Sequence, residues 1–246
     1  MEGIIRGKKN EPLKAVVYAD AGKGKSTLGE SFPNPFFLDL EGSTDRLDVD
    51  RVDLRKGTFA SVMEWLNVLA REEHGYQTLV VDTLDWLEPL IWASTSKRLE
   101  VKNIEVPGFH KGYREASLEE WPRFLNGCSI LSEKKKMHIL LLAHAETKKM
   151  NDPMIGDYDR WDIKLHKWAV PRCVEWAELV GFLITESMVR RLGTKEQVTQ
   201  GDERMLIVNG GGHFVAKNRF NYKERAIKGT KDKPLNYELI AKELGI

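Results

Sequence analysis

The sequence predicts an α/β fold, in which a mainly parallel β-sheet is flanked by helices and extended by antiparallel strands near the C-terminus. A short apolar run, a glycine-rich loop and a helix start follow one another at 13–28. Short apolar runs then alternate with helical periodicity as far as about residue 177, which is the order of a parallel sheet with crossover helices. From residue 180 onward the pattern changes to strands separated by tight turns, which is typical of antiparallel pairing.

Length, charge and cysteine content indicate a single-domain protein without a membrane span. The 246 residues suffice for one domain with a large core, so we expect a single domain over 1–246, with an N-terminal tail at 1–12 and a C-terminal extension at 220–246. The 38 basic and 37 acidic residues nearly cancel, so any contact with nucleic acid has to come from local clusters. The two cysteines form no metal-binding spacing, the N-terminus is polar, and no run of about 18 apolar residues occurs, which predicts a cytoplasmic protein without a membrane span.

The first apolar run, 15–18, is short and partly β-branched, which indicates a buried strand. It leads into 19–26, which matches the phosphate-binding pattern G-x-x-x-x-G-K-[ST] except that Ala19 stands at the first glycine. Strand, loop and helix occur in the order that this loop requires, so a surface turn merely rich in glycine and lysine is the weaker interpretation. Gly22 and Gly24 can take the positive φ angles that turn backbone N–H groups toward phosphate oxygens.

The side chains of this loop predict a nucleotide bound together with Mg²⁺. Lys25 supplies a positive charge at the β- and γ-phosphates, and the hydroxyl of Ser26 is placed to ligate the metal. A helix that opens at Lys25 adds the positive end of its dipole. The expected nucleotide-binding residues are Asp20, Ala21, Gly22, Lys23, Gly24, Lys25, Ser26 and Thr27, although the sequence gives no role to Lys23.

Two further apolar strands end next to acidic residues. The strand at 36–40 precedes Glu41, and a P-loop sheet holds its nucleotide at the carboxyl ends of the strands, so Glu41 is expected near the γ-phosphate, where it can orient the attacking water. A solvated loop glutamate explains this position equally well. The strand at 78–82 ends in Asp82, which matches the Walker B pattern of a metal-holding aspartate; a helix cap at the same place can coexist with that role. The D-x-x-G pattern at 39–42 also occurs in GTPases, but no switch segment or guanine-reading motif accompanies it.

Several segments predict the helices that connect these strands. The first helix begins near Lys25 and ends before Pro33. The segment 58–73 is amphipathic, and an apolar helix follows Asp82. A capping-box pattern at 117–120 predicts a helix to about residue 136. Further helices are expected at 165–177, with a break near Pro171, and at 236–244.

The strand at 137–144 is the most apolar, which predicts a central position in the sheet. Its last residue, His144, is expected to face the nucleotide, where a polar side chain can sense the γ-phosphate and pass its state to the next loop. A buried, satisfied histidine is the competing interpretation. The segment 146–167 that follows is long, polar and charged, which indicates a functional loop.

Basic and aromatic residues are interleaved in two segments, 97–115 and 146–167. This composition suits single-stranded DNA, through phosphate contacts and base stacking, although composition alone favours two solvated loops. The candidate DNA-binding residues are Lys102, Phe109, Lys111, Tyr113 and Arg114 in the first segment and Lys148, Lys149 and Arg160 in the second.

Four motifs stand in one order along the chain, the loop at 19–26, F-L-D-L-E at 37–41, V-V-D at 80–82 and A-K-N-R at 216–219. This order resembles the RecA-type ATPase core, which implies a RecA-like P-loop NTPase fold with ATP at the interface of a homo-oligomer, either a ring or a filament. The resemblance implies that Glu41 activates water and that Lys217 and Arg219 reach the nucleotide of a neighbouring subunit. RecA has a glutamine sensor where this chain has His144.

The chain is more similar still to compact phage-encoded RecA-like ATPases that act as single-strand annealing proteins. The shared stretches lie at 107–113, 158–167, 174–178 and 214–219, so the resemblance covers most of 13–225. It implies slow, DNA-stimulated hydrolysis of Mg·ATP, single-stranded DNA as a partner of both basic segments, and a single-strand binding protein as a candidate partner. Two alternatives stay open: a non-hydrolysing scaffold in which ATP stabilises an oligomeric DNA annealer, and an accessory ATPase of a replication or helicase complex.

Overall fold

The structure is a computed structural model. It describes residue 7 and residues 11–154, 156–192 and 195–246, without the side chains of 186–202. Most of the predicted N-terminal tail at 1–12 therefore lies outside the described residues. Within the described ranges, no helix is long and apolar enough to cross a membrane.

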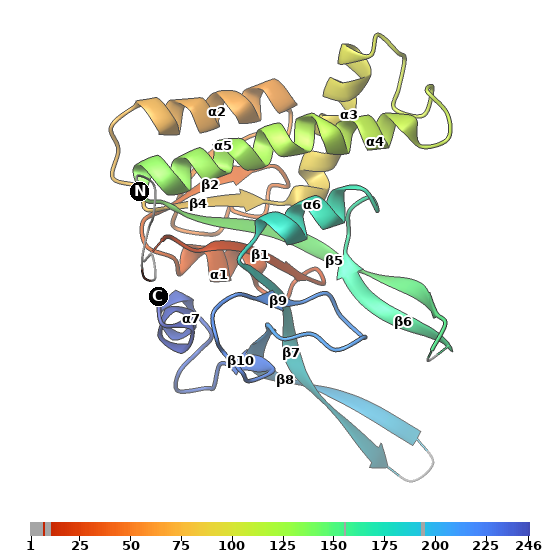
Figure 1. Ribbon diagram of the computed structural model, residues 1–246. Coiled ribbons are helices and arrows are strands. Elements are labelled where there is room, and N and C mark those ends of the chain that lie inside the picture. The colour runs from red at the N-terminus through yellow and green to blue at the C-terminus, as the bar shows by residue number, and fades with distance from the viewer. Residues whose placement is uncertain (1–6, 8–10, 155, 193–194) are drawn as a thin grey trace.

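A mainly parallel sheet forms the centre of the molecule, with the strand order β10-β8-β7-β1-β5-β4-β2-β3 (Figure 1). The strands are β1 (Lys14–Ala19), β2 (Pro35–Asp39), β3 (Asp50–Asp53), β4 (Thr78–Asp82), β5 (His138–Asp152), β7 (Leu179–Leu192), β8 (Lys195–Ile207) and β10 (Ala226–Lys228). From β7 to β3 in this order, neighbouring strands run parallel. Strands β8 and β10 are antiparallel to their neighbours. The predicted α/β fold and its antiparallel C-terminal strands are confirmed, and β5 lies centrally as expected.

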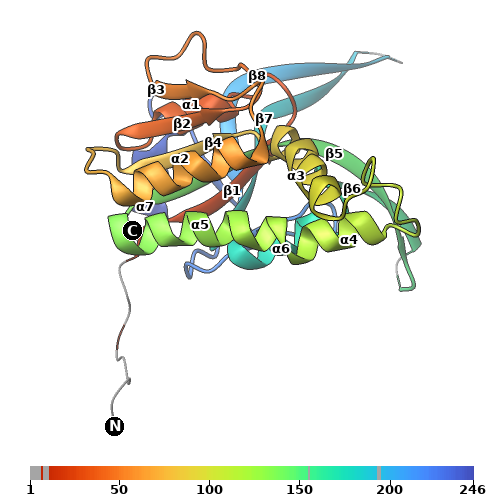
Figure 2. The same cartoon turned by 90° about the horizontal axis from the view of Figure 1, so that it is seen from above.

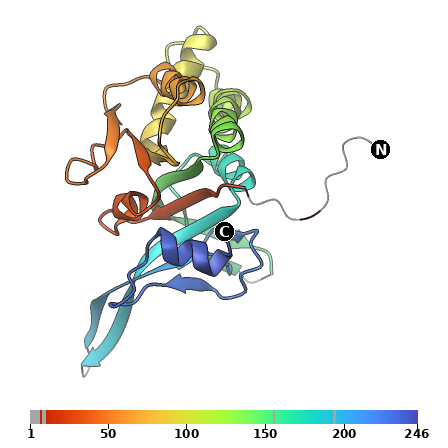
Figure 3. The same cartoon turned by 90° about the vertical axis from the view of Figure 1, so that its left-hand side faces the viewer.

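Helices cover both faces of this sheet (Figure 3). On one face lie α2 (Phe59–Arg71), α3 (Leu84–Arg98), α5 (Glu120–Lys135) and α6 (Ala169–Trp176), and on the other lie α1 (Lys25–Glu30) and α7 (Tyr237–Leu244). Successive side chains of a strand point to opposite faces, so β1 contributes to the hydrophobic core on each face of the sheet. Val16 and Tyr18 pack in the core with α2, α3, α5 and α6, whereas Ala15 and Val17 pack in the core with α1 and α7. Figure 2 shows α2 and α5 side by side across the sheet.

Two helix boundaries differ from the sequence-based expectation. Residues 111–118 form a separate helix, α4 (Lys111–Leu118), so the helix predicted from 117–120 begins at Glu120 instead. The Ser117 hydroxyl, expected to cap that helix, donates to the Arg114 carbonyl. The predicted break near Pro171 is wrong, because Pro171 lies in the first turn of α6, where its missing N–H costs no hydrogen bond.

The segment predicted as a polar loop at 146–167 is largely a β-hairpin. Strand β5 continues past His144 to Asp152 and pairs with β6 (Gly156–Ile163) without a register shift. Most of this hairpin is half-buried or exposed on both faces, and period-2 alternation indicates a strand only where one face is apolar. The pattern of apolar residues therefore does not predict this hairpin.

A second hairpin joins β7 to β8 and also leaves the sheet on its carboxyl side (Figure 1). Strand β8 begins at Lys195, so most of the polar segment before Met205 is strand backbone. A register shift separates Thr185 from Ser187 in β7. A short strand, β9 (Lys217–Asn218), pairs antiparallel with the start of β7.

Candidate functional site

The phosphate-binding loop connects β1 to α1. Gly22 and Gly24 have φ angles of 73° and 86°, as the sequence predicts. Lys25 is buried, and its Nζ donates to the carbonyl oxygens of Ala19 at 3.4 Å and Asp20 at 3.3 Å. Burial lowers the pKa of Lys25, against the attraction of nearby carboxylates. The lysine is thus held across the mouth of the loop in an orientation that suits a phosphate.

Asp82, Ser26 and Ser43 form a corner that suits Mg²⁺. The hydroxyls of Ser26 and Ser43 each donate to Asp82 Oδ2 at 2.6 Å. Asp82 is fully buried, and its Oδ1 has no hydrogen-bond partner in the part of the chain that the structure describes. Burial raises the pKa of this carboxyl. A buried carboxylate oxygen without a partner, beside a serine hydroxyl, fits a Mg²⁺ ion whose other ligands are phosphate oxygens and water. Ser43 was missed by sequence reasoning.

Asp39 shapes the loop that carries Glu41. Its carboxylate accepts the backbone N–H groups of Glu41 at 3.2 Å and Gly42 at 2.6 Å, and also the hydroxyl of Thr44. Asp39 is buried, so these bonds fix the turn that follows β2. The D-x-x-G pattern therefore has a structural function here, which is to position Glu41.

His144 lies between two carboxylates at the end of the parallel part of β5. Its Nε2 is 3.6 Å from Glu41 Oε1, and its Nδ1 is 2.9 Å from Asp85 Oδ2. The backbone N–H of His144 also donates to Asp85 Oδ1 at 2.9 Å. Burial raises the pKa of Glu41, whereas in Asp85 the effect of burial is outweighed by the hydrogen bonds from His144, which lower its pKa.

The structure brings the predicted phosphate, metal and water-activating residues to one edge of the sheet. Lys25 and Ser26 follow β1, Glu41 follows β2, Asp82 ends β4, and His144 lies on β5. Asp85, in the first turn of α3, was missed because no motif at a fixed distance along the chain indicates it.

Two residues of the β7–β8 hairpin contact the phosphate loop. A methyl group on Gly24 would lie 2.5 Å from Cζ and from Nη1 of Arg204, so the guanidinium packs against this glycine. Lys23 Nζ donates to the hydroxyl of Thr185 at 3.2 Å, and Thr185 pairs with Arg204 across the hairpin. Lys23, which had no role in the sequence analysis, thus joins the loop to β7. No motif in the sequence indicates that Arg204 lies at this loop.

Lys217 and Arg219 lie at the opposite edge of the sheet from the phosphate loop. Lys217 pairs with Val180 near the start of β7, whose neighbour β1 begins at the same edge. Lys217 Nζ donates to the carbonyl oxygens of Val174 at 2.6 Å, Glu175 at 3.0 Å and Ala177 at 2.7 Å, and Arg219 Nη2 donates to that of Glu175 at 3.3 Å. Both side chains therefore cap the C-terminal end of α6, whose last carbonyls have no partner within the helix.

The first candidate DNA-binding segment exposes most of its predicted residues. Lys102, Lys111 and Arg114 are exposed, and Phe109 is 96% exposed. Tyr113 differs, because its ring stacks on His166 at a centroid distance of 4.1 Å and its hydroxyl donates to Glu105.

The second candidate segment holds two of its three cations in ion pairs. Lys148 Nζ lies 2.9 Å from a Glu146 oxygen and 3.7 Å from Asp162 Oδ2, and Arg160 Nη2 donates to the same Asp162 oxygen at 2.8 Å. Lys149 points to the other face of the hairpin, since successive strand residues alternate, and it is exposed.

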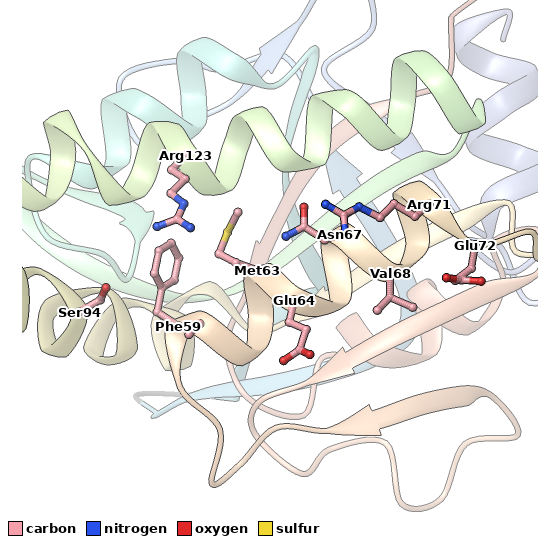
Figure 4. Close-up of a pocket in the computed structure, with 10 residues that line it drawn as sticks. Phe59, Met63, Glu64, Asn67, Val68, Arg71, Glu72, Ser94 and Arg123 are labelled. Atoms are coloured by element: carbon pink, nitrogen blue, oxygen red, sulfur yellow. The ribbon is translucent and has the colours of Figure 1, made fainter.

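A separate pocket of about 350 Å³ opens in the helical layer. Figure 4 shows that α2 supplies most of its lining, with Arg123 of α5 pointing toward Phe59 and Ser94 of α3 at one end. None of the predicted site residues lines it.

Comparison with known proteins places these features in a family. The model of the AAA domain family matches residues 11–220, which include all the residues of the nucleotide site. No curated protein matches the chain. Among solved structures, the RadB recombinase is similar, with 11% sequence identity, a TM-score of 0.50, and coverage of 89% of this chain and 87% of that one. The flagellar accessory protein FlaH from Methanocaldococcus jannaschii has 8% identity, a TM-score of 0.45, and coverage of 91% and 87%.

At such identities, the likeness to RadB concerns the fold alone, and that fold is the RecA-type α/β core predicted from the sequence. The family match covers most of the chain and includes the phosphate loop together with the acids that face it. The chain therefore belongs to the AAA domain family, and it combines a phosphate-binding loop with a RecA-type fold.

Proposed function

We propose that this protein hydrolyses Mg·ATP and binds single-stranded DNA, and that it promotes strand annealing as phage-encoded RecA-like proteins do. One observation carries the ATPase part. The 2.6 Å bond from Ser26 to Asp82 and the 3.6 Å pair of Glu41 and His144 lie at the same sheet edge as Lys25. Phosphate, metal and water-activating groups thus occupy one site.

The chemistry assigned to each residue follows from its surroundings. Lys25 binds the β- and γ-phosphate oxygens, and Ser26 with Asp82 would hold Mg²⁺, which neutralises charge on those phosphates when bound. Glu41 orients the attacking water and accepts its proton. Burial raises the pKa of Glu41, which brings this base closer to the pH at which it operates. His144 presents Nε2 toward the γ-phosphate side while Asp85 holds Nδ1.

The proposed binding of DNA is supported by exposed basic and aromatic side chains, together with the family resemblance of the sequence. Phe109 is almost fully exposed beside Lys111 and Arg114, and an aromatic ring next to cations suits a stacked base with its phosphates. Lys149 offers a further free cation on the β5–β6 hairpin. Within this proposal, Tyr113 positions the first segment rather than stacking on a base.

The proposal includes a homo-oligomer in which Lys217 and Arg219 complete the neighbour's nucleotide site. Their place at the amino edge of the sheet keeps them from their own phosphate loop, which supports a function in trans. A single-strand binding protein is the further partner that the family resemblance favours.

The test is ATP turnover with and without single-stranded DNA, combined with nucleotide binding. We expect Lys25→Ala to abolish turnover. We expect Glu41→Gln to bind ATP normally and not to hydrolyse it, because an amide cannot take up the proton of the water. Lys56→Ala and Glu64→Gln remove a lysine and an acid that are exposed on the surface, and these control variants should behave as wild type.

Each contrary result has its own meaning. Undiminished turnover by Lys25→Ala would contradict the phosphate-loop assignment. ATP binding by the wild type without any turnover would favour the non-hydrolysing scaffold. Loss of nucleotide affinity in Glu41→Gln would show that Glu41 maintains the loop rather than activates water.

A further inference from the structure

The base of the β7–β8 hairpin covers one side of the phosphate loop. Arg204 packs its guanidinium against Gly24, the residue before Lys25. The neighbouring strand supplies Thr185, whose hydroxyl accepts a hydrogen bond from Lys23. Two points of the loop therefore contact a hairpin that lies about 160 to 180 residues further along the chain, and one of these contacts places a cation on the loop.

The strand order shows which part of a nucleotide Arg204 would meet. The groups that act on the γ-phosphate come from β2, β4 and β5, which all lie on one side of β1. Strands β7 and β8 lie on its other side. A nucleotide whose γ-phosphate points to Glu41 and Asp82 must extend its remaining phosphates and its nucleoside across the loop toward β8. Arg204 lies on that path.

A cavity continues from Arg204 in this direction. It has a volume of about 520 Å³ and is lined by Glu203, Arg204, Gly229, Thr230, Lys231, Pro234 and Leu235. This volume is in the range of small-molecule sites, which combine apolar walls with a few polar groups. Among its lining residues, Pro234 and Leu235 are apolar, and Glu203, Thr230 and Lys231 carry polar or charged side chains. The cavity is thus large enough for a base and its ribose.

The charge of Arg204 also favours an anion at this place. Among the side chains that the structure describes, no carboxylate lies within ion-pair distance, 4.0 Å, of its guanidinium. Lys23 and Lys25, the two residues that flank Gly24 in the loop, carry the same sign as Arg204. A guanidinium presents a planar fork of donors that matches two phosphate oxygens at once. Bound phosphates would neutralise all three cations.

We propose that Arg204 is a nucleotide-binding residue of the chain's own site, which contacts the α- or β-phosphate, and that the cavity at 229–235 receives the nucleoside. This assignment rests on the proposed binding of ATP and adds the residue that holds the part of the nucleotide shared by ATP and ADP. It assigns the β7–β8 hairpin a direct part in nucleotide binding.

Equilibrium titration of the full chain with ATP and with ADP, in the presence of Mg²⁺, tests the assignment. Arg204→Ala should weaken ATP and ADP by a similar factor of about 10 to 100, the range for a hydrogen bond to a charged group. Arg204→Lys keeps the charge but not the fork, so it should lose only part of the affinity. Lys228→Ala is the matched control, because Lys228 is an exposed cation on the next strand, opposite Met205, and it should stay within about threefold of wild type.

Two outcomes would overturn the assignment. Arg204→Ala could bind both nucleotides as Lys228→Ala does, which would make the guanidinium a packing group only. Alternatively, it could bind ADP normally and ATP weakly, which would place Arg204 at the γ-phosphate. If Arg204→Ala does not fold, as judged by thermal unfolding, Arg204→Gln retains the aliphatic stem and decides between the same results. Absence of nucleotide binding by the wild type would instead contradict the proposed function itself.

Discussion

Asp85 fixes the orientation of His144 through both of its oxygens. One oxygen accepts the backbone N–H, and the other accepts Nδ1–H, so Nε2 is turned toward Glu41. A carboxylate that accepts Nδ1–H of a histidine determines which nitrogen is free to act. Within the proposed function, Asp85 is therefore a positioning residue, which would act on the nucleotide only through His144.

We expect Asp85→Asn to lower the maximal turnover rate by about tenfold or more, while ATP affinity stays unchanged, because the amide can present an NH₂ group to Nδ1 and reverse the ring's donor pattern.

The pH dependence of turnover gives a second readout for the same variant. Glu41 acts deprotonated, and burial raises its pKa above the ordinary value of 4.5, so wild-type turnover should fall with decreasing pH before pH 4.5 is reached. The charge of Asp85 contributes to that increase, so the fall should move to lower pH in Asp85→Asn.

Steady-state rates between about pH 4 and 9 check this expectation, a range that spans the ordinary pKa values of both acids and histidine. Asp48→Asn is the control, since it removes an exposed carboxylate from the loop between β2 and β3, which also carries Glu41. Asp85 would have no function beyond packing if Asp85→Asn kept the wild-type rate and its turnover fell at the same acidic pH as that of the wild type.

The residues that sequence reasoning located share one property, which is a fixed distance from the end of a strand. Lys25, Ser26, Glu41 and Asp82 all lie at or just beyond the carboxyl end of an apolar run. Because parallel strands end at one edge, their convergence could be predicted. Asp85 faces its partner from a helix, and Arg204 reaches the loop from a strand more than 170 residues away, so only packing in three dimensions brings them to the site.

At the scale of elements, the β5–β6 hairpin divides its cations between two faces. Lys148 and Arg160 share Asp162 as a partner, and this cluster stabilises the hairpin. Lys149 is exposed on the other face, where a phosphate could neutralise it. One face is therefore held by ion pairs, and the other exposes Lys149 opposite Asp159.

We expect Lys149→Ala to reduce the salt dependence of single-stranded DNA binding, because one phosphate contact fewer releases fewer counterions. The slope of log K against log salt concentration should decrease in magnitude by about 0.7. Binding titrations at several salt concentrations measure it, with Lys134→Ala, an exposed lysine of α5, as the control. If both variants keep the wild-type slope, the hairpin does not contact DNA in the way proposed.

The helices and strands that could be predicted from the sequence are those that carry apolar side chains on one face or on both. Strands β1, β2 and β4 of the parallel sheet are almost wholly buried, and α2 has a buried stripe of Phe59, Val62, Met63, Leu66 and Leu69, all as expected. Strand β3 is mostly exposed and was not predicted. Helix α4 was missed because it is short and follows a loop without periodicity. The β5–β6 hairpin was missed because pairing between its own strands, rather than burial, determines its conformation.

At the scale of the whole molecule, the nucleotide site and the pair Lys217 and Arg219 occupy opposite edges of one sheet. Such an arrangement is typical of a surface that can join one subunit to the next, head to tail. Lys217 binds two carbonyl oxygens of α6 and that of Ala177 just beyond it, so its removal would expose the end of that helix. Arg219 has a single longer bond to the same helix, which makes it the better residue to alter.

We expect Arg219→Ala and Lys25→Ala proteins to be nearly inactive alone and to regain part of the turnover when mixed. In a mixed assembly, some interfaces pair an intact phosphate loop with an intact Arg219, and an arginine delivered in trans contributes about 10³–10⁵ in rate in other phosphoryl-transfer systems. Turnover measured against mixing ratio, with light scattering to confirm co-assembly, checks this. Mixed assemblies that form and yet regain no activity would leave Arg219 as a helix cap only.

The continuity of β5 has a mechanical consequence. The strand passes from the sheet through His144 to Asp152, and its pairing with β6 shows no register shift between Ala145 and Asp152. This stretch is about 26 Å long at the usual rise of a strand, and it contains no hinge. A tilt of about 5° where it leaves the sheet would sweep its tip through roughly 2 Å over this length. The β7–β8 arm differs, because it has its register shift directly beyond Thr185, and such an irregularity bends a strand locally. One arm is therefore straight in its pairing and the other is bent at its base, and both begin at the sheet edge that carries the phosphate loop.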